Sequence, residues 1–192
     1  SYLTLAERLV EPPPPHLVIT HGVAGCGKSR AAKRLLLHER TATTLRLRSD
    51  VERKRLYAMA TTARSGSPPD GGIYTSEASE LTYQRLRQLA RELLASRWSV
   101  IVDASFLERK RRDTFHELAI EMGAGFSIVA PTATLGRLRA RVRGRLACGR
   151  DASEATLAVL ERQLARIEAL SADELAYVLP RSHTEDAPTE RR

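Results

Sequence analysis

The sequence has few of the features that mark secreted, disulfide-stabilised or membrane-spanning proteins. Its 192 residues include only two cysteines, Cys26 and Cys148, whose contexts match neither a disulfide framework nor the spacing of metal ligands. No stretch approaches the roughly 18 consecutive apolar residues of a membrane span, and the first ten residues lack the basic start and apolar run of a signal peptide. We therefore expect a soluble cytoplasmic protein without a membrane partner.

Lysine is also scarce, because four lysines stand beside 27 arginines. The net charge of +8 favours an anionic partner such as a nucleotide, a sugar phosphate or a nucleic acid. A GC-rich coding genome produces such an arginine bias without functional pressure, so a nucleic-acid partner stays possible but is not favoured. With 42% hydrophobic residues, the chain is long enough for one well-buried domain.

Apolar segments alternate with helical patterns from residue 16 onward. The strand-like segments are LVIT, TTLRLRSD, SVIVDAS, GFSIVAP and LAYVLP, the last at residues 175–180. This alternation predicts an α/β fold of three layers, α/β/α, around a five-stranded parallel sheet. Glycines and prolines at residues 65–72 predict a loop, which we expect to be poorly ordered.

Both ends of the chain differ in composition from the alternating region. The prolines at residues 12–15 force extended backbone, so residues 1–15 are typical of a linker after a missing upstream domain, or of a trimmed start. Residues 16–180 carry the predicted domain. Residues 181–192 form a polar tail that cannot bury a face.

Residues 22–29 read GVAGCGKS, which is the spacing of a phosphate-binding P-loop between a strand and a helix. Glycines let backbone N–H groups curl around phosphate oxygens, and the helix N-terminus adds a favourable dipole. Lys28 would reach the β- and γ-phosphates of ATP, and the Ser29 hydroxyl would bind Mg²⁺. Cys26 would contribute only its backbone or would sense redox conditions. The expected nucleotide-binding residues are Gly22, Val23, Ala24, Gly25, Cys26, Gly27, Lys28, Ser29 and Arg30.

Two acidic residues end predicted strands. Asp50 follows TTLRLRS and would receive the proton of a phosphoryl acceptor, or it would sit in the first turn of a helix capped by Ser49 and Glu52. Asp103 closes SVIVD and would face the metal or the acceptor, or it would cap a helix. Cations follow both acids, and Arg53 is the better candidate for contact with a phosphorylated or acidic acceptor.

Arginines recur every four residues at Arg137, Arg141 and Arg145, so a helix would present them on one side. Arg139 and Arg143 would point elsewhere. One interpretation is an arginine-rich helical lid that closes over transferring phosphates. The other is a solvated helix face, which is the commoner origin of a run of charge.

These stretches resemble the P-loop kinases of the zeta-toxin and polynucleotide-kinase-like group. They are most similar to the small kinase domain that is fused behind an aminoglycoside-phosphotransferase-like domain. The segments that carry the resemblance are HGVAGCGKSR, LRLRSDVERKRLYAM, SVIVDASFLERKRRDTF, RARVRGR and DASEATLAVLERQ.

The resemblance implies ATP held by residues 22–29, acceptor chemistry at Asp50, and contact with substrate or metal from Asp103. It also implies phosphate contacts from Arg141 and Arg145, a nucleoside-kinase-like strand order of 2-3-1-4-5, and an upstream aminoglycoside-phosphotransferase-like domain. We thus expect an ATP- and Mg²⁺-dependent kinase that phosphorylates a hydroxyl of a small molecule. The alternatives are a polynucleotide 5′-hydroxyl kinase and a nucleotide-dependent switch that regulates a fused domain.

Overall fold

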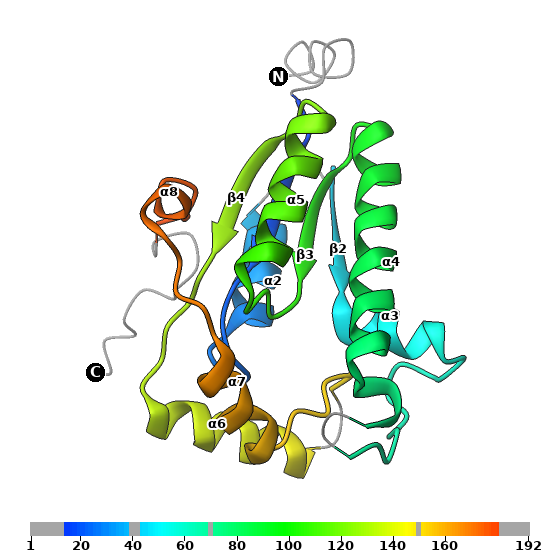
Figure 1. Cartoon of the computed structure of the whole chain (residues 1–192), viewed down its shortest axis with the longest axis vertical. Coiled ribbons are helices and arrows are strands. Elements are labelled where there is room, and N and C mark those ends of the chain that lie inside the picture. The colour runs from blue at the N-terminus through cyan, green and yellow to red at the C-terminus, as the bar shows by residue number, and fades with distance from the viewer. Residues whose placement is uncertain (1–13, 39–42, 69–70, 149–150, 181–192) are drawn as a thin grey trace.

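The computed structural model describes residues 14–38, 43–68, 71–148 and 151–180 (Figure 1). The predicted linker before residue 14, the tail 181–192 and residues 69–70 of the predicted loop lie outside this part of the chain. Four strands form a parallel sheet in the order β2-β3-β1-β4. They are β1 (His16–Thr20), β2 (Thr44–Arg48), β3 (Ser99–Asp103) and β4 (Gly125–Val129).

Helices cover both faces of the sheet, as the α/β/α prediction requires. Within the described residues they are α2 (Lys28–His38), α3 (Ser49–Leu56), η1 (Gly72–Tyr74), α4 (Ser76–Ala95), α5 (Arg109–Glu121), α6 (Leu135–Cys148), α7 (Leu157–Arg166) and α8 (Ala172–Leu175). Helices α4 and α5 pack on one face, and α2 packs on the other. Figure 1 shows α6 and α7 below the carboxyl ends of the strands. None of the helices in the described ranges has the length and apolarity to cross a membrane.

The two cores follow from side-chain alternation along the strands. Leu17 and Ile19 of β1 belong to the cluster under α4 and α5, whereas Val18 between them belongs to the cluster against α2. Successive side chains of a strand point to opposite faces, so a continuous apolar run serves both layers of helices. The central strands β1 and β3 are therefore buried on both faces, whereas β2 at the edge of the sheet is partly exposed.

The prediction of a fifth strand at residues 175–180 was wrong. Val178 forms a single parallel bridge to Ile128 of β4, with hydrogen bonds from the Ile128 N–H to the Tyr177 carbonyl at 2.8 Å and from the Leu179 N–H to the Ile128 carbonyl at 2.9 Å. The segment lies where a fifth strand would lie, but α8 and the turn after it extend to Tyr177, so that only residues 178–180 of the described chain remain for pairing. The expected order therefore holds for four strands only.

Candidate active site

The carboxyl ends of the strands border a cavity of about 860 Å³. Its wall combines the loop between β1 and α2, the start of α3, η1, α4, the β3–α5 connection, α6 and α7. Ligands of open parallel sheets bind at this edge, because the loops after the strands are free to diverge there. The cavity is therefore where the sequence-predicted site residues can meet.

The glycine loop folds as a phosphate cradle. Gly22 and Gly27 adopt φ angles of +133° and +112°, which side chains disfavour. The Lys28 ammonium donates to the carbonyls of Gly22 and Val23, at 2.8 Å each. Ala24 to Arg30 line the cavity, whereas Gly22 and Val23 do not. Backbone N–H groups at the start of α2 thus face a space that can hold phosphate oxygens.

Asp103 lies beside the cradle and is tied to it. The Ser29 hydroxyl donates to the Asp103 carboxylate at 2.8 Å, and Arg46 and Arg48 of β2 pair with the same carboxylate oxygen. Asp103 ends β3, and α5 begins only at Arg109, so the helix-cap interpretation of Asp103 was wrong.

Ser29 and Asp103 are the residues that could hold a divalent cation. Within the described part of the chain, no group of three or more histidine, cysteine, aspartate or glutamate side chains could hold a metal by itself. Mg²⁺ is commonly bound through one or two protein oxygens together with substrate phosphates and water. The Ser29–Asp103 pair fits that donor set, since it lies next to the phosphate cradle.

Asp50 is the second residue of α3 and lines the cavity. The residue at the helix cap is Arg48, which makes no side-chain capping bond, and Glu52 pairs with Arg55. The interpretation of Ser49 and Glu52 as a capping box was therefore wrong. Burial raises the pKa of Asp50 above the ordinary 3.8, although the charges of Arg48 and Arg53 oppose this.

Arg53 reaches the same cavity from the next turn of α3. Its guanidinium donates to the Ile73 carbonyl at 2.8 Å and to the Ser79 hydroxyl at 3.4 Å, and it lies 5.2 Å from the centre of the Tyr74 ring. These contacts fix a buried cation near Asp50. Tyr74 and Tyr83 also line the cavity.

The arginines of α6 divide between two sides of the helix as the spacing predicts. Arg137, Arg141 and Arg145 line the cavity, whereas Arg139 pairs with Glu161 on the surface. Arg141 donates to the carbonyls of Gly25 and Cys26, at 3.0 and 3.3 Å. The arginine face therefore lies against the phosphate cradle, and its action as a closing lid stays a prediction.

Helix α7 adds residues that sequence reasoning missed. Gln163, Arg162 and Arg166 line the cavity, and the Gln163 carbonyl oxygen accepts from the Ala24 N–H at 2.6 Å. The four-residue spacing of Arg162 and Arg166 repeats the α6 pattern and could have identified them. The Gln163 contact carried no such signal, because its partner is a backbone group 139 residues away.

An apolar cluster joins the cradle to α6 and α7. Val23, Ala24 and Cys26 pack with Leu138 and Val142 of α6, and with Leu160 of α7 in the same cluster. Cys26 is buried with only 5% of its surface exposed. Its side chain therefore helps to attach the cradle to the helices that cover it.

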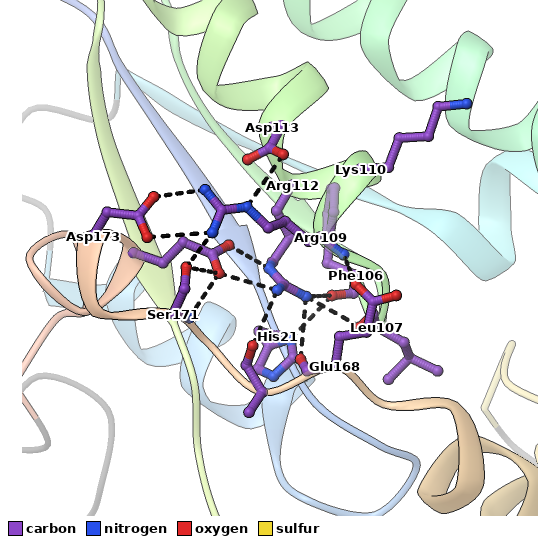
Figure 2. A network of polar contacts seen from close by, with 12 residues as sticks. His21, Phe106, Leu107, Arg109, Lys110, Arg112, Asp113, Glu168, Ser171 and Asp173 are labelled. Atoms are coloured by element: carbon purple, nitrogen blue, oxygen red, sulfur yellow. Dashed lines mark hydrogen bonds and ion pairs between the residues drawn. The ribbon is translucent and has the colours of Figure 1, made fainter.

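A polar network joins the β3–α5 connection to His21 and to the segment around α8 (Figure 2). The Arg112 guanidinium pairs with Glu174 and donates to the Phe106 and Leu107 carbonyls at 3.1 Å each. His21, which precedes the cradle, bonds through Nδ1 to the Phe106 carbonyl at 2.9 Å. Burial lowers the pKa of His21, so the ring is neutral at physiological pH. The network thus fixes the β3–α5 connection relative to the start of the cradle.

A phosphate cradle between β1 and α2, followed by an acidic strand end and a basic helical cover, defines a P-loop kinase-like α/β fold. The chain belongs to the AAA domain family, whose model matches residues 17–170. No curated protein sequence matches it.

Solved structures of kinases share the fold at low sequence identity. A sugar kinase from Janibacter sp. HTCC2649, in unliganded form, is 20% identical, with 86% of this chain and 84% of that chain covered and a TM-score of 0.60. The APS kinase of Mycobacterium tuberculosis, solved with AMPPNP and APS, is 24% identical, with 76% and 78% covered and a TM-score of 0.55.

A chain of the Pnkp1/Rnl/Hen1 RNA repair complex has a TM-score of 0.60 at 18% identity, with 79% of this chain and 43% of that chain covered. At these identities the likeness shows the fold alone. These comparisons do not show a fusion to an aminoglycoside-phosphotransferase-like domain, which stays a prediction.

Proposed function

We propose that the protein is a kinase that transfers the γ-phosphoryl group of ATP to a hydroxyl of a small molecule. The observation that carries this proposal is that Asp50 lines the same cavity as the phosphate cradle. Burial raises the pKa of its carboxyl group. A carboxylate with a raised pKa is a stronger base, which suits the acceptance of a hydroxyl proton.

In the proposed reaction the acceptor hydroxyl forms a bond to the γ-phosphorus as the bond to the β–γ bridging oxygen breaks. Asp50 takes the hydroxyl proton, and ADP leaves with the bridging oxygen. Lys28 would turn from the Gly22 and Val23 carbonyls toward the β- and γ-phosphates. Arg141 and Arg145 would stabilise the negative charge on the transferring group.

Ser29 and Asp103 would hold Mg²⁺, which neutralises charge on the β- and γ-phosphates when it is bound. The Ser29–Asp103 hydrogen bond at 2.8 Å supports this assignment, because it holds the two oxygen ligands next to each other. Ion pairs with Arg46 and Arg48 also hold the Asp103 carboxylate in position. Asp103 would therefore bind the cation without moving.

The test follows labelled γ-phosphate from ATP to acceptors grouped as neutral sugars, sugar acids, sugar phosphates and an oligonucleotide with a free 5′-hydroxyl. Asp50→Asn should abolish transfer and leave AMPPNP binding in place, whereas Lys28→Ala should impair both. Asp113→Asn is the matched control, since Asp113 pairs with Arg109 outside the cavity. Full transfer by Asp50→Asn would refute the assignment of the base.

A polynucleotide 5′-hydroxyl kinase is the second candidate. It is supported by the net charge of +8, by the placement of Arg53 one turn after Asp50, and by the likeness to a chain of an RNA repair complex. Transfer to the oligonucleotide alone would favour it, and such binding should weaken steeply with salt. Nucleotide binding without phosphoryl transfer to any acceptor would favour the third alternative, a nucleotide-dependent switch that regulates a fused domain.

A further inference from the structure

Four cations follow Asp103 in the sequence, and the structure separates them. Arg109 lies on the surface and pairs with Asp113 and Asp173, and Arg112 is buried in its pair with Glu174. Figure 2 shows Lys110 pointing away from this network. Arg111 is the member of the run that lines the cavity.

The Arg111 side chain is held in place on an aromatic ring. Its guanidinium carbon lies 4.2 Å from the centre of the Tyr83 ring, and its Nε donates to Glu108 at 3.1 Å. Tyr83 is itself fixed, because its hydroxyl accepts from the Phe106 N–H at 3.1 Å and contacts the Ser105 hydroxyl at 3.3 Å. A stacked arginine keeps its fork of donors in one orientation.

Among the described residues, two polar groups on side chains that border the cavity lack hydrogen-bond partners. Nη1 of Arg111 and the hydroxyl of Tyr74 are both buried without a hydrogen bond. Leaving such groups unpaired costs free energy. They belong to separate elements, α5 and η1, yet both side chains border the same cavity. A ligand that rearranged this wall and accepted these bonds would remove the cost.

Arg53 contributes a second cation there. It is 8% exposed, donates to a carbonyl and a hydroxyl, and forms no ion pair within 4.0 Å with a carboxylate of the described chain. Arg53 donates to Ser79 of α4 at 3.4 Å, one turn before the Tyr83 ring that carries Arg111. The two arginines therefore face this region from α3 and α5.

Asp50 acts electrostatically on Arg53, but other carboxylates of the cavity are engaged by other cations. Asp103 is engaged by Arg46, Asp151 by Arg48, and Glu154 by Lys54. Glu108 does contact Arg111, but its side chain is about half exposed, so the pair is screened by water. Among the described residues, Arg111 thus has a solvent-screened carboxylate partner, and Arg53 has the charge of Asp50 nearby. An anionic group of the ligand would pair with guanidinium donors that these contacts leave open.

We propose that Arg111, together with Arg53, binds an anionic group of the phosphoryl acceptor. The group is a phosphate, sulfate or carboxylate carried near the hydroxyl that Asp50 deprotonates. Two arginine forks bind such planar or tetrahedral oxyanions through paired hydrogen bonds. The inference rests on the proposed kinase function, since it specifies the class of substrate that the same cavity accepts.

A binding test separates this inference from the kinase proposal. AMPPNP and Mg²⁺ are first added to saturation and their binding is measured, and failure at this step counts against the kinase proposal. Inorganic sulfate is then titrated by calorimetry with the cradle filled. Wild type should bind sulfate, Arg111→Gln should weaken this binding roughly 10-fold or more, and Lys110→Gln should match wild type.

A kinetic test compares two acceptors identified by the labelled-phosphate assay, one neutral and one that carries an anionic group. Arg111→Gln should raise KM for the charged acceptor with little change in kcat, and Arg111→Lys should restore part of the affinity. Transfer to a sugar acid or sugar phosphate identifies a small-molecule source of the anion, and transfer to the oligonucleotide identifies a backbone phosphate. Absence of sulfate binding, equal binding by Arg111→Gln, or preference for the neutral acceptor would overturn the inference.

Discussion

Gln163 of α7 accepts a hydrogen bond from the Ala24 N–H of the phosphate cradle at 2.6 Å. Ala24 is 6% exposed, so water cannot replace this contact at low cost. The bond thus joins the cradle to a helix more than 130 residues further along the chain. Its consequences can be measured without knowledge of the acceptor.

Gln163→Leu should lower the free energy of unfolding by about 1–3 kcal/mol, because it leaves the Ala24 N–H buried without an acceptor. Urea denaturation provides the measurement. Gln88→Leu on the exposed side of α4 is the matched control and should change stability by less than about 0.5 kcal/mol. Equal effects of the two variants would mean that the Gln163 bond contributes nothing specific.

Gly25→Ala should destabilise the cradle. A Cβ at Gly25 would lie 2.8 Å from the Leu138 carbonyl oxygen, and the φ of +81° is strained for any side chain. We expect a loss of at least about 1 kcal/mol in the free energy of unfolding and weaker AMPPNP binding. Gly144→Ala, in the open middle of α6, should instead stabilise by roughly 0.5–1 kcal/mol. An unchanged Gly25→Ala protein would show that α6 is not held against the cradle.

The transfer rate should depend on the protonation of Asp50. Because burial raises the pKa of Asp50 above 3.8, the base is lost to protonation at a higher pH than an exposed aspartate would be. The acid limb of the profile of kcat/KM against pH should therefore lie above pH 3.8. Arg48→Gln removes a positive charge that lowers the pKa of Asp50, so it should move the acid limb to higher pH. An unchanged limb would exclude Asp50 as the titrating group.

The buried Arg112–Glu174 pair should be worth far more than the neighbouring Arg109–Asp173 pair. Both join α5 to the α8 region, but the first pair has side chains 1% and 7% exposed, and the second 44% and 63%. Arg112→Met should cost about 3–5 kcal/mol, because it leaves a buried carboxylate unpaired. Arg109→Met should have little effect, since exposed pairs are screened.

Acid should weaken the same buried pair. Burial opposes ionisation of Glu174, but hydrogen bonds from Arg112 and Ser171 outweigh it and lower its pKa to about 2. The stabilisation is therefore complete above the ordinary value of 4.5 and is lost as the pH falls toward 2. Glu174→Gln should flatten this part of the curve of unfolding free energy against pH. A curve of unchanged slope would show that another group is responsible.

Sequence reasoning identified the elements that depend on local rules. The glycine loop and the alternation of strands and helices have fixed spacings, so the cradle, the parallel sheet and the arginine side of α6 could all be placed in advance. The prediction of a fifth strand was wrong, because the apolar run at residues 175–180 does not reveal that Leu175 belongs to the short helix α8. Periodicity alone does not separate these outcomes.

Long-range partners limited the prediction of the site. Arg46 and Arg48 alternate on β2, so they share a face, but their convergence on Asp103 depends on the order of the strands. The sequence does not distinguish Arg111 from Arg109, Lys110 and Arg112. Their different environments depend on how α5 packs against the rest of the protein. Propensity and motif specify the element, whereas packing decides which of its side chains enters the cavity.

The apolar cluster of Val23, Ala24, Cys26, Leu138, Val142 and Leu160 packs the phosphate cradle against its helical cover, so we expect the two to open as one cooperative unit. Separate opening of the cover would expose this cluster to water, so amide protons of the cradle and of the buried parts of α6 and α7 should exchange with solvent at similar rates. Nucleotide binding would then protect all three segments together.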